Sequence, residues 1–336
     1  MDCVIHIGTE KTGTTSIQRT LDEGADLLLC DGTLWPPVFR DGQDPRIACY
    51  AMDDAALDLR KRRRGLTTPE AVTKFRTQFE NRLERELAAA PGARTLLIVN
   101  EHLSRMRARS EPARLKALLD GFASRIRIVL YLRRQDLMMR SMYSQVIKVG
   151  GTRENVFPLF EQEEEGDFTT FNYRRIVDLW AGTFGREALE IRVFERPQLV
   201  EGDVIADFFH TVGLARPDGL QAAKSNENLS PEALLSLREL NRHLPREARG
   251  NLGPLSARIF TGPGMPVERA KAEEFLSHFQ QDNDDVARRY LGRDRLFEPI
   301  GEGEYPETVE PASLEVSAQT VAWHFARLWE GRNRKF

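Results

Sequence analysis

The fold is decided by the stretch Cys3-Val4-Ile5-His6-Ile7-Gly8-Thr9-Glu10-Lys11-Thr12-Gly13-Thr14-Thr15-Ser16-Ile17-Gln18-Arg19-Thr20-Leu21. A short apolar, β-branched run, a loop between two glycines and a segment of small hydroxyl residues predict a strand, a tight turn and the start of a helix. In the first turn of a helix the backbone N–H groups have no intrahelical partner and the helix dipole is positive. We therefore expect this loop to hold a phosphate-like group.

The position of the lysine indicates which phosphate the loop takes. In a nucleotide-triphosphatase loop, G-x-x-x-x-G-K-[ST], the lysine that follows the second glycine reaches the β- and γ-phosphates. Here Thr14 stands at that position, and Lys11 lies two residues before Gly13. The run from Lys11 to Ser16 resembles the 5′-phosphosulfate loop of the sulfotransferases that use 3′-phosphoadenosine-5′-phosphosulfate (PAPS) as sulfuryl donor. The structural alternative is a glycine loop without a ligand.

A second pattern follows the apolar run from Ile126 to Leu132, which predicts a strand that passes directly into a helix. Sulfotransferases bind the donor's 3′-phosphate through R-[NR]-[PQ]-x-D-x-x-x-S, and this chain is similar at Arg133, Asp136 and Ser141. A guanidinium pairs bidentately with phosphate, and a serine hydroxyl adds a donor without charge. The structural alternative is that Arg133 and its neighbour Arg134 pair with the acidic run Glu161 to Asp167.

The third pattern lies between these two. The apolar run Arg94 to Val99 predicts a buried parallel strand, and the polar residues Glu101 and His102 follow its end. Since ligands of open α/β sheets bind beyond the carboxyl ends of the strands, these side chains are expected beside the phosphate loop, where either can act as a general base. Glu101-His102-Leu103-Ser104 is similar to the T-H-[LF]-P stretch of cytosolic sulfotransferases, whereas other branches use a glutamate. Both candidates stay open, and a structural hydrogen bond is the alternative for each.

The three motifs resemble those of the PAPS-dependent sulfotransferase family. The resemblance implies an α/β fold: a doubly wound parallel sheet with a P-loop-like phosphosulfate loop and a helical C-terminal extension. We expect one domain over residues 1–336, with the α/β core in 1–215 and a mainly helical extension in 216–336. The implied cofactor is PAPS, its product is 3′-phosphoadenosine-5′-phosphate (PAP), and no metal is required.

The implied reaction is sulfuryl transfer to a hydroxyl or amine acceptor, such as a saccharide. Lys11 would neutralise charge on the leaving oxygen, and His102 or Glu101 would take the acceptor proton. The cofactor-binding residues would be Lys11, Thr12, Gly13, Thr14, Thr15, Ser16, Arg133 and Ser141. Two other functions are a non-catalytic nucleotide-binding protein and a small-molecule kinase with a P-loop-like fold. The missing lysine after Gly13 argues against the kinase.

Composition narrows the class of protein. Hydrophobic residues make up 41% of the chain and charged residues 29%, as in ordinary globular proteins, and the net charge of −3 argues against a nucleic-acid binder. Three cysteines indicate a reducing compartment rather than a disulfide framework. A strand beginning at residue 2 leaves no room for a signal peptide, and no run of 18 apolar residues occurs. We therefore expect a cytoplasmic protein with no membrane span.

Capping residues and apolar periodicity predict the remaining elements. A helix should begin at Pro69 and stop before Pro91, while little regular structure is expected from Asp22 to Asp54. Further predictions are a helix over 173–184, a strand over 189–194, a helix ending before Gly213, a helix from Pro231 and a final helix bearing Val321, Phe325 and Trp329.

The acceptor leaves only a weak trace in the sequence. The basic run Arg60 to Arg64 suits an acidic acceptor, although a solvated helix face is the plainer explanation of such a run. Arg105, Arg107 and Arg109 also favour an anionic saccharide. A lipid or a small phenol stays open as well.

Overall fold

The computed structural model describes residues 1–40, 46–56, 58–158, 168–217, 228–245, 248–249, 252–310 and 315–333, with side chains for all of these except 331–333. The acidic run Glu161 to Asp167 lies outside the described residues. By its internal contacts the chain divides into two units. Unit 1 comprises Met1–Arg133, Glu165–Lys224 and Asp282–Phe297, and unit 2 comprises Arg134–Glu164, Ser225–Gln281 and Glu298–Phe336. This division crosses the boundary expected near residue 215, because the chain enters unit 2 directly after a strand and later returns to unit 1.

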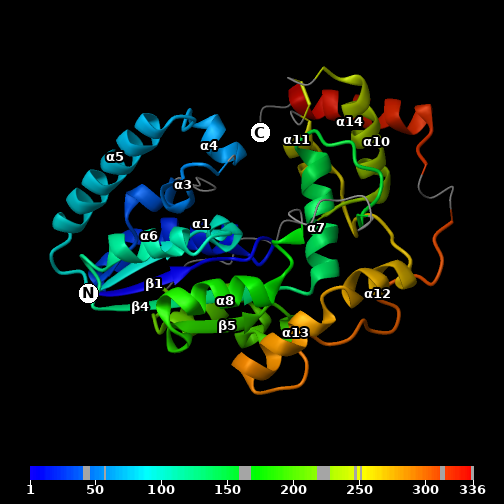
Figure 1. The fold of residues 1–336 in the computed structure, drawn as a ribbon. Coiled ribbons are helices and arrows are strands. Elements are labelled where there is room, and N and C mark those ends of the chain that lie inside the picture. Colours follow the sequence, from blue (N-terminus) through cyan, green and yellow to red (C-terminus); the bar gives the residue numbers. More distant parts are fainter. Residues whose placement is uncertain are drawn as a thin grey trace. The chain divides into compact units, whose positions relative to one another are not determined.

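Unit 1 is built on a five-stranded parallel sheet with the strand order β2-β3-β1-β4-β5. The strands are β1 (Asp2–His6), β2 (Thr33–Leu34), β3 (Thr95–Val99), β4 (Arg125–Leu132) and β5 (Leu189–Val193). The central strand β1 pairs with β3 from Asp2↔Thr95 to His6↔Val99 and with β4 from Asp2↔Arg125 to His6↔Val129 (Figure 1). The predicted parallel α/β sheet is confirmed.

Helices cover both faces of this sheet. Successive strand side chains point to opposite faces, and residues 3–6 of β1 and 128–132 of β4 are all buried. Helices α1 (Thr14–Glu23) and α9 (Val204–Val212) contact each other, as do α6 (Ser110–Leu119) and α8 (Tyr173–Phe184). The other helical segments of unit 1 are α2 (Ala25–Cys30), η1 (Pro37–Phe39), α3 (Arg46–Ala51), α4 (Leu59–Arg63), α5 (Pro69–Ala88), η2 (Glu101–Arg105), η5 (Arg186–Ala188), η6 (Arg196–Gln198), η7 (Val200–Gly202) and η8 (Ala287–Leu291).

The predicted helix boundaries are set by local caps. The Thr68 hydroxyl accepts a hydrogen bond from the Ala71 N–H at 3.2 Å at the start of α5. Asn172 caps α8 in the same way, and α9 ends at Gly213 in the left-handed conformation. These helices are confirmed because their signals lie within a few residues of each boundary.

The prediction of little regular structure between Asp22 and Asp54 is wrong. This segment contains α2, the edge strand β2, η1 and α3. The indole of Trp35 donates to Asp22 at 2.8 Å, and the Tyr50 hydroxyl of α3 donates to Glu80 of α5 at 2.7 Å. A two-residue strand that pairs with the distant β3 leaves no periodic pattern in the sequence.

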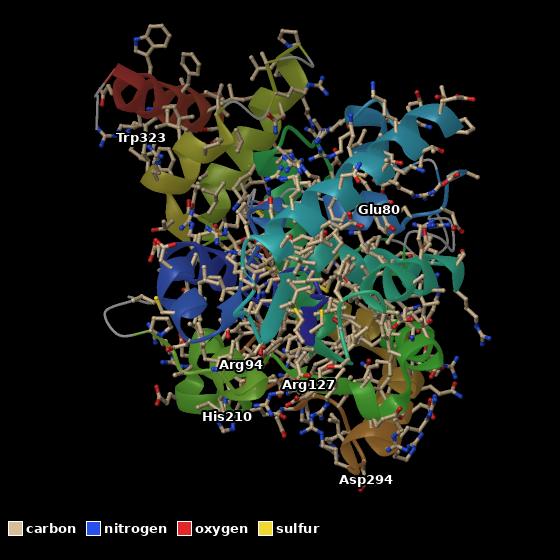
Figure 2. All side chains as sticks on the ribbon, turned by 90° about the vertical axis from the view of Figure 1, so that its left-hand side faces the viewer. Glu80, Arg94, Arg127, His210, Asp294 and Trp323 are labelled. Carbon is tan, nitrogen blue, oxygen red and sulfur yellow. The ribbon has the colours of Figure 1, made fainter. Side chains whose placement is uncertain are left out.

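Unit 2 is mainly helical, with a small antiparallel ribbon of β6 (Asn228–Leu229) and β7 (Thr261–Gly262). Its helices are α7 (Gln135–Lys148), α10 (Pro231–His243), α11 (Gly253–Ile259), α12 (Arg269–Ser277) and α14 (Ala318–Asn333), and α13 (Gln280–Val286) leads back to unit 1. Aliphatic side chains of α7 and α10 form its core. Trp323, labelled in Figure 2, and Trp329 lie on α14 and are more than half exposed, at 54% and 57%.

Candidate active site

The loop after β1 continues the sheet before it turns. The Thr9 N–H donates to the Tyr131 carbonyl of β4 at 2.8 Å, and the Tyr131 N–H donates to the Gly8 carbonyl at 2.7 Å. The Thr12 hydroxyl then donates back to the Thr9 carbonyl at 2.6 Å. Lys11, at the crown of the loop, has a left-handed backbone with φ 63°. A non-glycine residue in this region is strained, and such strain is concentrated at functional sites.

Glycines at both ends of the loop allow close approaches. Gly13 precedes α1 with φ 83°, and a Cβ there would lie 2.8 Å from Val204 Cγ1 of α9. Gly8 has φ 102°, and a Cβ there would lie 3.0 Å from the Cα and the carbonyl oxygen of Glu101. The two glycines therefore bring the loop against α9 and against η2, which begins at Glu101.

Two backbone N–H groups at the start of α1 have no acceptor among the residues that the structure describes. The Ser16 and Ile17 N–H groups donate to the Gly13 carbonyl at 2.9 and 3.1 Å, but no described residue accepts from the Thr14 or Thr15 N–H. The Thr14 side chain is 2% exposed, and its hydroxyl makes no hydrogen bond of ordinary geometry with the described residues. It does interact with the Glu101 carboxylate, whose pKa it lowers. This arrangement is suited to an anion at the helix N-terminus.

Arg133 lies at the end of β4 and contacts the loop directly. Its guanidinium donates to the Lys11 carbonyl at 2.8 Å, which joins residues 122 positions apart in the chain. The same guanidinium lies 5.6 Å from the ring centre of Phe194, and the Arg133 carbonyl accepts a hydrogen bond from the Tyr173 hydroxyl. The chain leaves β1 toward β2 on one side and leaves β4 toward β5 on the other, so these adjacent strand ends form a topological switch point. Ligands of open α/β sheets bind at such points.

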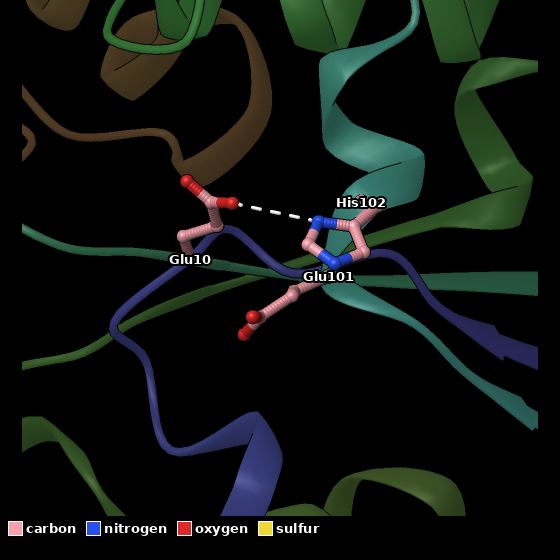
Figure 3. Close-up of side chains that lie close together, drawn as sticks. All are labelled: Glu10, Glu101 and His102. Atoms are coloured by element: carbon pink, nitrogen blue, oxygen red, sulfur yellow. Dashed lines mark ion pairs between the residues drawn. The ribbon is translucent and has the colours of Figure 1, made fainter. Parts of the chain in front are cut away.

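Glu10 is a buried carboxylate at the centre of a charged cluster. Arg105, at the end of η2, binds it with two nitrogens, of which Nε donates to Oε1 at 3.0 Å. His102 Nδ1 lies 3.5 Å from Glu10 Oε1 (Figure 3). Burial raises the pKa of the Glu10 carboxyl, but the contacts with His102 and Arg105 lower this pKa by more, so it lies well below its usual value. Glu10 is therefore ionised and orients both partners.

Glu101 and Lys11 are affected by the same cluster. Burial, and then the charge of Glu10, raises the pKa of the Glu101 carboxyl above its usual value, against the effects of His102 and Lys11. Burial lowers the pKa of the Lys11 ammonium, although the charges of Glu101 and Glu10 oppose this. Displaced pKa values of this kind are typical of catalytic sites.

Three of these side chains are close enough to share a cation. Glu10, Glu101 and His102 each place a ligand atom within 4.8 Å of the others (Figure 3). The Glu10 carboxylate, however, is already bound to Arg105, and Arg60 Nη2 lies 3.7 Å from it. These positive charges oppose a further cation. Chemistry without a metal stays a prediction.

Asp136 belongs to the predicted 3′-phosphate motif, and Arg134 precedes it by two residues. In unit 2 the Arg134 guanidinium donates to both Asp136 oxygens, at 2.8 and 3.0 Å, and also binds Glu304. This pair is almost completely buried and is structural. Ser141 lies partly buried on α7 in unit 2. Its predicted role together with Arg133, which ends the first segment of unit 1, stays a prediction.

Neither Glu10 nor the role of Arg105 in holding it could be predicted from the sequence. An acidic residue beside the loop lysine was the only signal in the sequence, and its partners lie 92 and 95 positions later in the chain.

The residues of the basic run Arg60 to Arg64 differ in their burial. Lys61 is buried and donates to the Asp53 and Asp54 carbonyls, whereas residues 62–64 are exposed.

No model of a known protein family matches this chain. An uncharacterized protein of Archaeoglobus fulgidus is 26% identical over 184 residues, which cover 51% of this chain and 47% of that protein. The chain thus matches about half the length of this curated relative. A solved sulfotransferase from Alicyclobacillus acidocaldarius is similar over 74% of this chain and 97% of its own, with 16% identity and a TM-score of 0.45. Within the described residues, no helix combines the length and hydropathy of a membrane span.

Proposed function

We propose that the protein is a PAPS-dependent sulfotransferase that moves a sulfuryl group to a hydroxyl or amine acceptor. The observation that supports this most is the hydrogen bond from Arg133 to the Lys11 carbonyl, at 2.8 Å. It brings the predicted 3′-phosphate arginine against the predicted phosphosulfate loop, and the two come from different motifs. A ligandless glycine loop gives no reason for that contact or for the open N–H groups of Thr14 and Thr15.

In this proposal different groups of the chain bind the donor, stabilise the leaving oxygen and position the loop. The N–H groups at the start of α1, with the hydroxyls of Thr14, Thr15 and Ser16, bind the 5′-phosphate. The acceptor oxygen forms its bond to sulfur as the bond from sulfur to the phosphate oxygen breaks, in line. Lys11 stabilises the negative charge that develops on this leaving oxygen. Glu10 and Arg105 hold the crown of the loop in place.

Two side chains are candidates for the base that takes the acceptor's proton. His102 has the ionised Glu10 carboxylate beside Nδ1, which leaves Nε2 to accept a proton. The pKa of Glu101 is raised. If Glu101 is the base, the rate should therefore fall on acidification at a higher pH than it would with an ordinary carboxyl as base. We expect the true base to lower turnover by about 10²- to 10⁴-fold when replaced, in Glu101→Gln or His102→Gln, without loss of PAP affinity.

Calorimetric titration with PAP, AMP and ATP tests the donor. We expect PAP to bind at least about tenfold more tightly than AMP, which corresponds to about 1.4 kcal/mol. Equal binding of ATP and PAP would exclude the proposal and favour a general nucleotide-binding protein. Magnesium-dependent preference for ATP would favour the kinase instead. Turnover should not change when a chelator is added, because in this proposal Lys11 stabilises the leaving oxygen in place of a metal.

A further inference from the structure

A cavity in unit 1 is lined by five arginines, and we call it the arginine pocket. Its volume is about 560 Å³, within the range of small-ligand sites. It is lined by Arg107, Arg109, Asn172, Arg174, Arg175, Asp178, Leu179, Asp285 and Arg289. These residues come from the segment between η2 and α6, from the start of α8, and from α13 and η8.

The pocket has more positive than negative charge. Arg289 pairs with Asp178 and Asp285 at 2.7 and 2.9 Å, and Arg174 pairs with Asp282 at 2.9 Å. The exposed guanidinium of Arg109 makes no hydrogen bond or ion pair with any residue that the structure describes. Five guanidiniums and two carboxylates therefore line the pocket, and the third carboxylate, Asp282, lies outside the lining.

Arg175 is held inside this charged environment. Its guanidinium donates to the Arg107 carbonyl at 2.9 Å, so a main-chain contact fixes its position. Burial lowers its pKa, the charge of Arg107 lowers it further, and Glu111 opposes this. The Glu111 carboxylate is itself occupied by the backbone N–H groups of Arg107 and Ala108, at 2.6 and 3.1 Å. An anionic ligand would relieve the repulsion between these arginines.

The arginine pocket lies at the same edge of the sheet as the candidate active site. Helix α8 begins at this edge, because Tyr173 binds the Arg133 carbonyl at the end of β4 and the next two residues line the pocket. Arg107 comes two residues after η2, whose first residues are Glu101 and His102. A ligand in the pocket can therefore extend toward the proposed base.

The chemistry of the lining narrows the ligand. Leu179 is its only apolar side chain among the described residues, so an acyl chain or an aromatic ring finds little surface to bury. Guanidiniums recognise carboxylates bidentately, while Asn172 and the aspartates can bind hydroxyl groups. Alternating carboxylates and hydroxyls are characteristic of acidic saccharides.

We propose that the arginine pocket binds the carboxylates of an acidic saccharide that is the sulfuryl acceptor, which rests on the proposed sulfotransferase function. Binding there places a hydroxyl of the same saccharide beside His102 and Glu101. The pocket thereby selects the acceptor, whereas the loop after β1 binds the donor.

The test is a titration with unsulfated chondroitin tetrasaccharide, which carries carboxylates, and with its carboxyl-reduced form, which keeps the rings and loses the charges. We expect the variant Arg109→Ala/Arg175→Ala to bind the acidic tetrasaccharide at least about tenfold more weakly than the wild type. Its PAP affinity should not change. In transfer assays with PAPS, KM for the tetrasaccharide should rise more than kcat falls.

Arg125→Ala is the matched control, since Arg125 is exposed at the opposite end of β4. Equal weakening by this control, or equal binding of the carboxyl-reduced tetrasaccharide, would overturn the inference. If the double variant does not fold, the single variant Arg109→Ala is titrated in its place, because Arg109 is exposed and its replacement should not disturb the fold. Selective PAP binding without tetrasaccharide binding would refute the proposed ligand of the arginine pocket and leave the donor proposal intact. Tetrasaccharide binding without PAP selectivity would refute the donor proposal alone.

Discussion

Arg133 and Arg134 are neighbours in the chain, yet they belong to two charged clusters of different character. Arg134 and Asp136 in unit 2 are 6% and 0% exposed, and the Tyr305 hydroxyl also donates to Asp136 at 2.6 Å. Every oxygen of that carboxylate has a partner. Arg133 instead contacts a strained loop that leads into α1, where the described residues supply no acceptor for the Thr14 and Thr15 N–H groups.

The difference separates a structural cluster from the cluster for which we propose a binding role. In a buried ion pair whose hydrogen bonds are complete, these bonds offset the free energy of desolvation, so no ligand is needed to do so. A buried site with open donors and a left-handed lysine is costly unless something binds there. Substitutions in the first cluster should therefore affect stability, and substitutions in the second should affect binding and rate.

The largest effect on stability is expected in the structural cluster. Asp136→Asn leaves the Arg134 guanidinium buried without its counter-charge and should lower the free energy of unfolding by about 3–5 kcal/mol in urea denaturation. Asp120→Asn is the control, because Asp120 pairs with Lys116 at an exposed site, with side chains 52% and 39% exposed. That change should cost under about 1 kcal/mol. Equal losses in the two variants would show that the Asp136 network has no special structural role.

The largest effect on rate is expected at Lys11. Lys11→Ala should lower turnover by about 10²- to 10³-fold, since one preorganised donor to a developing anion is removed, while PAP affinity falls much less. Both residues have a side chain at the same left-handed position, so backbone strain is matched. Until the acceptor is established, slow PAPS hydrolysis can report the rate. An unchanged rate at saturating PAPS together with lost PAP binding would make Lys11 an anchor of the ground state.

Arg133→Ala should weaken PAP binding by about 2–4 kcal/mol, because a charge-assisted bidentate contact is lost. AMP lacks the 3′-phosphate, so its binding should change little. Calorimetry with both nucleotides measures this difference, and Arg125→Ala again serves as control. Equal loss of PAP and AMP binding would mean that Arg133 acts only by holding the Lys11 carbonyl.

The smallest effect is the sharpest test of the comparison. Thr14→Val removes a hydroxyl that makes no hydrogen bond of ordinary geometry and interacts only with the Glu101 carboxylate among the described residues, so stability should stay within about 0.5 kcal/mol while PAP binding weakens by about 1 kcal/mol. Thr20→Val in the same helix should lower stability and leave PAP binding unchanged, because the Thr20 hydroxyl donates to the Ser16 carbonyl at 3.0 Å. A loss of stability in Thr14→Val without a loss of PAP affinity would place Thr14 among the structural residues.

The strands β1, β3, β4 and β5, the caps of α5, α8 and α9 and the strand-to-helix turn after β1 could all be predicted from the sequence. These features depend on contacts within a few residues, or on apolar runs long enough to require burial on both faces. The strand β2 escaped prediction because two residues carry no periodicity and its partner is remote.

Which charged side chains contact one another depends on the tertiary packing. The pairing of Glu10 with Arg105, the contact of Arg133 with Lys11 and the arginine pocket all join residues from separate elements. Sequence spacing cannot reveal them, because a charged side chain finds its partner through the packing of the sheet and its helices. The same packing made Arg133 a contact of the loop and made Arg134 half of a buried ion pair, although the two side chains are chemically identical.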